Sequence, residues 1–165
     1  MSKIQPATTF DDPLVARIQE ILDRTLASAG PLQASFFGKP ERRLHAHAFL
    51  STWNSIYMCA VATTSEGGTA HLAALPVWFE ADGTLRMLLY TESVRAGDLA
   101  TRPRVALQKQ QDDGVVLTVY GTTRIVPGTD GTDPRGRNHV VLEIDISRIY
   151  ALGPYVSGPF AKKTA

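Results

Sequence analysis

The sequence predicts a mainly β fold, a six-stranded antiparallel β-barrel with flanking helices, from three observations. From residue 55 onward, short runs of apolar, β-branched and aromatic residues alternate with turn sequences such as Asp82-Gly83 and Asp112-Asp113-Gly114. The segments between most of these runs are too short for crossover helices, so consecutive strands are expected to pair as antiparallel hairpins. The runs number about six, and six strands joined in this way indicate a closed or half-closed barrel.

The first third of the chain carries helix signals instead. Asp12-Pro13 combines an N-cap residue with a proline that fits the first helical turn, and leucines and isoleucines then recur at helical spacing until Gly30-Pro31 ends the helix. Residues 33–40 are expected to form a loop, and 41–54 a second helix. The chain is thus predicted to be one domain, 1–165. We divide it into an N-terminal helical lead (1–54), a barrel (55–152) and a tail (153–165).

The strands follow from their composition and their boundaries. They are expected at residues 56–63, 69–79 and 85–90, in a run that starts at 105, and at 115–126 and 140–149. Pro76 lies inside the second run and indicates an edge strand or a bulge there, because proline has no N–H for the ladder. Residues 94–100 are expected to form a short helix, and the Gly- and Pro-rich stretch 127–138 a loop.

Composition excludes several classes of protein. The net charge is only +1, which argues against nucleic acid or an anionic membrane as the main partner. The single cysteine, Cys59, rules out an internal disulfide, and its apolar neighbours indicate a buried small side chain. The start has no hydrophobic signal segment, and no apolar run reaches the roughly 18 residues that span a bilayer, which indicates a cytoplasmic protein. His45 and His47 have no Cys or His at zinc spacing beside them, so no metal site is predicted.

Residues 90–99 form the most informative segment for function. A strand ends at Thr91 and a helix begins near Ser93, whose hydroxyl can cap it. Helix N-termini present unpaired N–H groups and a partial positive charge, and Arg95 adds a guanidinium whose shape matches phosphate oxygens. The segment is therefore a candidate phosphate site. The alternative is that Ser93 only caps the helix and Arg95 is a solvated surface charge.

Four segments of the chain resemble segments of the pyridoxamine 5′-phosphate oxidase-like family of FMN-binding split β-barrels, and their order and spacing also agree with that family. The strand ending in Ala62-Thr63 resembles the family's first, Ala-rich strand, and residues 75–79 (Leu-Pro-Val-Trp-Phe) resemble its second strand. Residues 89–95 (Leu-Tyr-Thr-Glu-Ser-Val-Arg) are similar to its flavin-phosphate segment, which residues 98–107 continue. Residues 119–122 (Val-Tyr-Gly-Thr) match its Val-x-Gly-x strand.

The resemblance implies a homodimer that binds two flavins at the subunit interface. It implies that the phosphate is held by Ser93 and Arg95 with Thr91 beside them, and that Gln108 or Lys109 reaches the flavin ring or its chain. The strand expected along the ring and the ribityl chain comprises Ala74, Leu75, Pro76 and Val77, with Trp78 next to it as a pocket-lining candidate.

The chain departs from the pyridoxamine 5′-phosphate oxidases themselves in two places. Residues 72–75 (Leu-Ala-Ala-Leu) lack the arginine of their second strand, and residues 140–146 lack their C-terminal Arg-x-His motif. We therefore expect an FMN-dependent oxidoreductase that acts on another small molecule, with no assigned catalytic residue. Two alternatives stay open: a deazaflavin-coenzyme-dependent reductase on the same fold, and a non-catalytic protein that binds flavin, haem or another tetrapyrrole.

Overall fold

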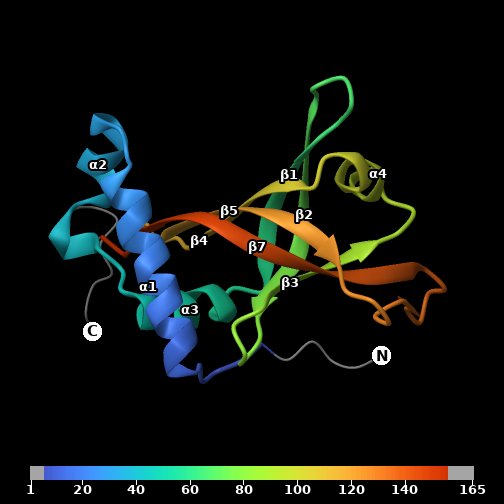
Figure 1. The fold of residues 1–165 in the computed structure, drawn as a ribbon, viewed down its shortest axis with the longest axis horizontal. Coiled ribbons are helices and arrows are strands. Elements are labelled where there is room, and N and C mark those ends of the chain that lie inside the picture. The colour runs from blue at the N-terminus through green and yellow to red at the C-terminus, as the bar shows by residue number, and fades with distance from the viewer. Residues whose placement is uncertain (1–5, 156–165) are drawn as a thin grey trace.

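The computed structural model describes residues 6–155 and confirms the predicted mainly β architecture. Seven strands form one antiparallel sheet in the order β3-β2-β1-β4-β5-β7-β6, and β3 also pairs with β7. This last pairing closes six strands into a barrel and leaves the two-residue strand β6 outside it. Figure 1 shows α1 and α2 at one end of the molecule and α4 at the other.

The elements follow one another with short connections. The helices are α1 (Asp12–Ala27), α2 (Pro31–Phe37), the 3-10 turn η1 (Pro40–Arg42), α3 (Ala46–Ser55) and α4 (Val94–Thr101). The strands are β1 (Met58–Thr64), β2 (Ala70–Phe79), β3 (Leu85–Tyr90), β4 (Arg104–Gln110), β5 (Val116–Ile125), β6 (Gly131–Thr132) and β7 (Asn138–Leu152). No helix within residues 6–155 has both the length and the apolar character needed to cross a bilayer.

The barrel is held together by one continuous apolar core. Side chains along β1, β4 and β5 alternate between buried and more exposed, which is the period-two pattern of a sheet with one covered face. The helix α3 closes the barrel with its aromatic side chains, since the rings of Phe49 and Trp53 lie 6.0 and 6.1 Å from that of Phe79 on β2. The helix α1 packs its buried face, which includes Ile18 and Leu22, against β7.

The helical lead differs in detail from the prediction. The predicted loop 33–40 was wrong, because residues 31–37 form α2; Pro31 begins that helix rather than only ending the previous one. The predicted helix 41–54 begins only at Ala46, because Arg43 is extended and bridges to Leu152 at the end of β7. Neither difference could be read from hydrophobic spacing, since α2 buries none of its residues.

The edge strand expected at Pro76 is present in the first part of β2. Residues 77–79 of β2 pair with β3, whereas residues 70–76 pair with β1 alone. Pro76 therefore lies in the half of the strand that has an open edge, where its missing N–H costs no ladder hydrogen bond. Arg95 of α4 contacts the carbonyl of Leu72 on this open edge, so the candidate site lies where α4 and the edge of β2 meet.

Candidate functional site at the start of helix α4

The start of α4 offers free hydrogen-bond donors. Ser93 is the N-cap residue, and its Oγ accepts a 3.3 Å hydrogen bond from the backbone N–H of Ala96. Its hydroxyl hydrogen is still available to a ligand, since a hydroxyl donates as well as accepts. By position, the N–H groups of Val94 and Arg95 have no acceptor inside the helix. Thr91 lies exposed just before this turn, and its backbone N–H donates to the carbonyl of Asn138 at 3.0 Å.

Arg95 connects α4 with the open edge of β2. One terminal nitrogen of its guanidinium donates to the carbonyl oxygen of Leu72 at 3.5 Å. Its Nε is enclosed and has no hydrogen-bond partner among the described residues. An enclosed donor without a partner costs free energy, so the site is chemically suited to an anion that would accept from it.

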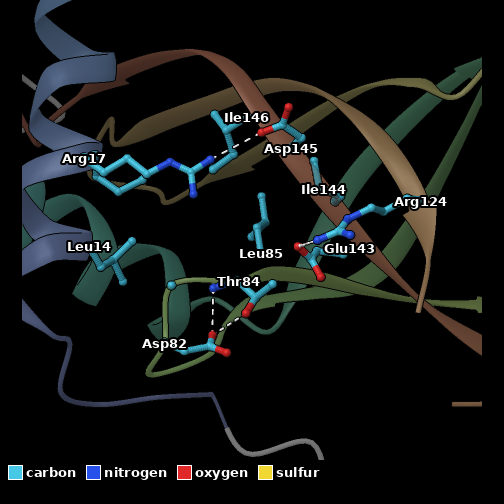
Figure 2. A pocket seen from close by; sticks show the side chains of 12 residues that line it. Leu14, Arg17, Asp82, Thr84, Leu85, Arg124, Glu143, Ile144, Asp145 and Ile146 are labelled. Atoms are coloured by element: carbon cyan, nitrogen blue, oxygen red, sulfur yellow. Dashed lines mark hydrogen bonds and ion pairs between the residues drawn. The ribbon is translucent and has the colours of Figure 1, made fainter. Parts of the chain in front are cut away.

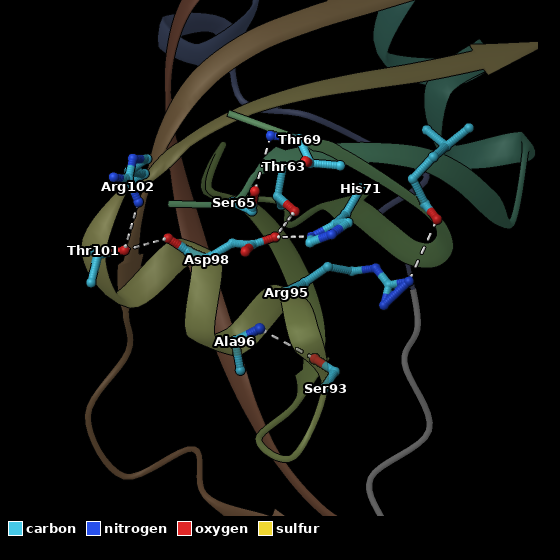
Figure 3. A network of polar contacts seen from close by, with 11 residues as sticks. Thr63, Ser65, Thr69, His71, Ser93, Arg95, Ala96, Asp98, Thr101 and Arg102 are labelled. Atoms are coloured by element: carbon cyan, nitrogen blue, oxygen red, sulfur yellow. Dashed lines mark hydrogen bonds and ion pairs between the residues drawn. The ribbon is translucent and has the colours of Figure 1, made fainter. Parts of the chain in front are cut away.

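A polar cluster that sequence reasoning missed lies beside Arg95. The carboxylate of Asp98 on α4 accepts a 2.6 Å hydrogen bond from the hydroxyl of Thr63 and lies 2.7 Å from Nδ1 of His71. Figure 3 shows the three side chains meeting between α4 and the β1–β2 pair. These hydrogen bonds, from Thr63 first and from His71, hold the pKa of the Asp98 carboxyl below its usual range. Asp98 is therefore a buried, ionised group that fixes the orientation of His71.

The face of β2, β1 and β4 opposite to this cluster is a platform of small side chains, and the two faces meet at the open edge of β2. Ala74 pairs with Ala60, which pairs with Gln108, and in the next row Leu72 pairs with Ala62, which pairs with Ala106. Leu72 and Met58 at its border are 69% and 42% exposed. The side chains of this platform, Met58, Ala60, Ala62, Leu72, Ala74, Pro76, Ala106 and Gln108, are exposed or half-buried.

The structure separates the predicted site residues into three groups. Thr91, Ser93 and Arg95 lie together at the start of α4, as the segment required. Ala74, Pro76 and Gln108 lie on the platform. The remaining residues point elsewhere: Leu75 packs against the core, Val77 is fully inside, and Trp78 is buried with its Nε1 donating to Glu80 at 2.9 Å.

Lys109 also belongs to the interior. Its Nζ donates to three backbone carbonyl oxygens, those of Trp53 at 2.8 Å, Ile56 at 2.6 Å and Val77 at 2.6 Å. Burial lowers the pKa of this ammonium group to about 8. Of the two alternatives on β4, the side chain that faces the platform is Gln108, whereas Lys109 joins the end of α3 to β2.

A separate cavity of about 450 Å³ lies between α1 and the β3–β7 side of the barrel (Figure 2). Its floor is apolar, and its rim carries two ion pairs. One joins Arg17 to Asp145, with 3.3 Å between nitrogen and oxygen, and the other joins Arg124 to Glu143. None of the predicted site residues lines it. His45 is the N-cap residue of α3 and His47 lies in its first turn, and residues 6–155 contain no cluster of three or more metal-ligating side chains.

Comparisons with known proteins agree on the fold. No family model matches the sequence, and no curated protein matches it. Among solved structures, the general stress protein 26 from Bacillus anthracis is similar with a TM-score of 0.56 and 18% identity, over 68% of this chain and 97% of that one. A conserved hypothetical protein from Mycobacterium tuberculosis is similar with a TM-score of 0.58 and 17% identity, over 74% and 98% of the two chains.

A third solved structure carries the family's own description. It is a putative pyridoxamine 5′-phosphate oxidase from Listeria innocua, similar with a TM-score of 0.50 and 13% identity, over 62% of this chain and 93% of that one. At sequence identities this low, the similarity shows a shared fold and nothing more. Together with the closed six-stranded topology, it identifies the fold of this chain as the split β-barrel of the pyridoxamine 5′-phosphate oxidase-like family.

Proposed function

We propose that this chain is a flavin-dependent oxidoreductase that binds FMN and acts on a small molecule as a cytoplasmic homodimer. The observation that carries the proposal is the juxtaposition of an anion site and a flat apolar platform. The start of α4, with Ser93 and Arg95, lies against the open edge of β2, and the platform extends from that same edge. A phosphorylated ligand with a planar ring needs these two features side by side.

The anion site fits a single phosphate group. The enclosed Nε of Arg95, the Ser93 hydroxyl and the free N–H groups of the first turn of α4 are all donors, and they come from neighbouring residues of the chain. A dinucleotide would need a second phosphate site, and the sequence has no glycine-rich dinucleotide motif. FMN is therefore favoured over FAD.

The platform fits the remainder of the cofactor. Its centre consists of alanines, which let a planar ring approach the backbone of β1 and β2 closely. Gln108 at its border has an amide that can both donate to and accept from a ring edge. When bound, the flavin supplies the hydride chemistry, while the protein orients it and shapes the space for the substrate.

A second copy of the chain is the proposed cover for the platform. Large apolar side chains rarely stay exposed in a contiguous group on a monomer, and Leu72, Met58 and the neighbouring Tyr57 are all exposed here. A dimer that met along this face would enclose the ligand between the two subunits. The predicted homodimer thus supplies the missing wall of the site.

Ligand titration tests the proposal. We expect FMN to bind more tightly than riboflavin and at least as tightly as FAD in calorimetric titrations. Arg95→Ala removes a charge-assisted hydrogen bond of about 1.5–3 kcal/mol and should weaken FMN binding by roughly one to two powers of ten, while riboflavin binding hardly changes. Arg24→Ala, an exposed arginine on α1, is the matched control and should change neither affinity.

The result that contradicts the proposal is equal affinity for FMN and riboflavin, since the phosphate site would then be unused. Absorbance of the purified protein separates the alternatives. A flavin gives a yellow band at ~450 nm, and a haem gives a Soret band. Binding of a deazaflavin coenzyme in preference to FMN would move the assignment to a deazaflavin-dependent reductase on the same fold.

A further inference from the structure

We propose that His71 is part of the phosphate site, and that it takes up a proton when the phosphate binds. The inference rests on the proposed function, because it concerns a phosphorylated ligand at the start of α4. It goes further by assigning a phosphate contact to the side chain of His71. It also predicts that binding is linked to a proton.

The orientation of His71 is fixed from one side. Its Nδ1 lies 2.7 Å from Asp98, a carboxylate that is only 7% exposed and that also accepts from Thr63 at 2.6 Å. Because Asp98 is ionised and only accepts, the ring carries its proton on Nδ1. The other ring nitrogen, Nε2, therefore has a lone pair and no proton while the ring is neutral.

The unused side of the ring belongs to the candidate site. His71 keeps 31% of its side chain exposed, and its neighbour Leu72 offers the carbonyl that Arg95 contacts. Figure 3 shows the imidazole of His71 between Asp98 and Arg95, above the start of α4 where Ser93 lies. A phosphate that accepted from the enclosed Nε of Arg95 would meet this ring edge.

The charges around the ring favour uptake of a proton on binding. The charged groups that face it are Asp98 and Arg95, both from α4, while β1 contributes the neutral hydroxyl of Thr63. One carboxylate and one guanidinium leave the free site close to neutral. A phosphate dianion adds two negative charges, and an opposite charge nearby stabilises the imidazolium. The proton comes from solvent and goes to Nε2, which then donates to a phosphate oxygen.

Calorimetry in two buffers measures this proton directly. At pH 8 an ordinary imidazole is neutral and a phosphomonoester is already a dianion, so proton uptake reports on the protein. We expect the enthalpy of FMN binding to differ between buffers of low and high ionisation enthalpy by an amount that corresponds to between about one half and one proton per FMN bound. Riboflavin should show no difference between the buffers.

Two variants assign the proton to His71. His71→Asn keeps an amide that can still donate to Asp98, and it should abolish the proton uptake and weaken FMN binding by about tenfold, with riboflavin unchanged. His71→Gln is the second variant, in case the first does not fold, and it should also abolish the uptake. His47→Gln, on the exposed side of α3, is the matched control and should keep both the uptake and the affinity.

The outcomes separate this inference from the function on which it rests. FMN binding that exceeds riboflavin binding but takes up no proton at pH 8 overturns the role of His71 and leaves the phosphate site intact. Uptake that persists in both His71 variants overturns it as well. Equal binding of FMN and riboflavin contradicts the proposed function itself.

Discussion

Replacement of Lys109 by methionine is expected to destabilise the fold without touching the candidate site. The three hydrogens of the ammonium match three buried carbonyl oxygens, two at the end of α3 and one on β2, and the charge also lies 4.8 Å from the ring centre of Trp53. Lys109→Met leaves these acceptors without their donor, at about 1–3 kcal/mol each.

The opposing contribution comes from burial of the charge. The pKa of Lys109 is lowered from 10.5 to about 8, which corresponds to about 3 kcal/mol that the variant recovers. With a loss of about 2 kcal/mol at each carbonyl, the net destabilisation at pH 7 is ~3 kcal/mol. In a chain of this size that lowers the melting temperature by roughly 6–12 °C. Urea or thermal unfolding followed by circular dichroism measures it.

The pH dependence gives a second measurement with a defined sign. Between pH 8 and 10.5 the unfolded chain holds a proton on Lys109 that the folded chain has released, so the stability of the wild-type protein rises with pH through this group. The difference between wild type and Lys109→Met should therefore widen from pH 7 to pH 10. Lys39→Met, on an exposed lysine, is the control and should show neither effect. An unfolding midpoint of Lys109→Met equal to that of the wild type would refute the reasoning.

Three further predictions concern association, reactivity and substrate. Light scattering should give twice the chain mass of 17.9 kDa, and Leu72→Asp should give a monomer while Leu32→Asp, on α2, leaves the dimer intact; a monomeric wild type would contradict the proposed interface. Cys59, whose pKa burial raises from 9.0 to about 12, should resist a maleimide at pH 8 until denaturant is added, and rapid labelling of the folded protein would show that the barrel opens there. Pyridoxamine 5′-phosphate should not be turned over, because residues 72–75 lack the expected arginine and β7 lacks the Arg-x-His motif; steady product formation would overturn this.

Local patterns in the sequence determined most of the elements. The start of α4 was predictable, because a capping hydroxyl at Ser93 and the strand that ends at Thr91 depend only on residues a few positions apart. The hairpin between β2 and β3 was predictable for the same reason, since Asp82-Gly83 supplies the turn and Gly83 adopts the positive φ that it requires. Gln108 and Lys109 remained alternatives in the sequence. Neighbouring residues of a strand face opposite sides, but the sequence does not show which side of β4 is the interior.

Tertiary structure decided the composition of the candidate site. Pairing of β3 with β7 closes the barrel and thereby determines which face of β4 points into its interior. As a result, the ammonium of Lys109 lies against backbone carbonyls rather than on the platform. Asp98 lies 35 and 27 positions along the chain from Thr63 and His71, so no local spacing connects the three. They meet because the register of β1 and β2 places Thr63 opposite His71, and because α4 packs against β1 beside them. A sequence pattern reports which side chains share a face of one element, whereas contact between elements depends on register and packing, which only the folded chain fixes.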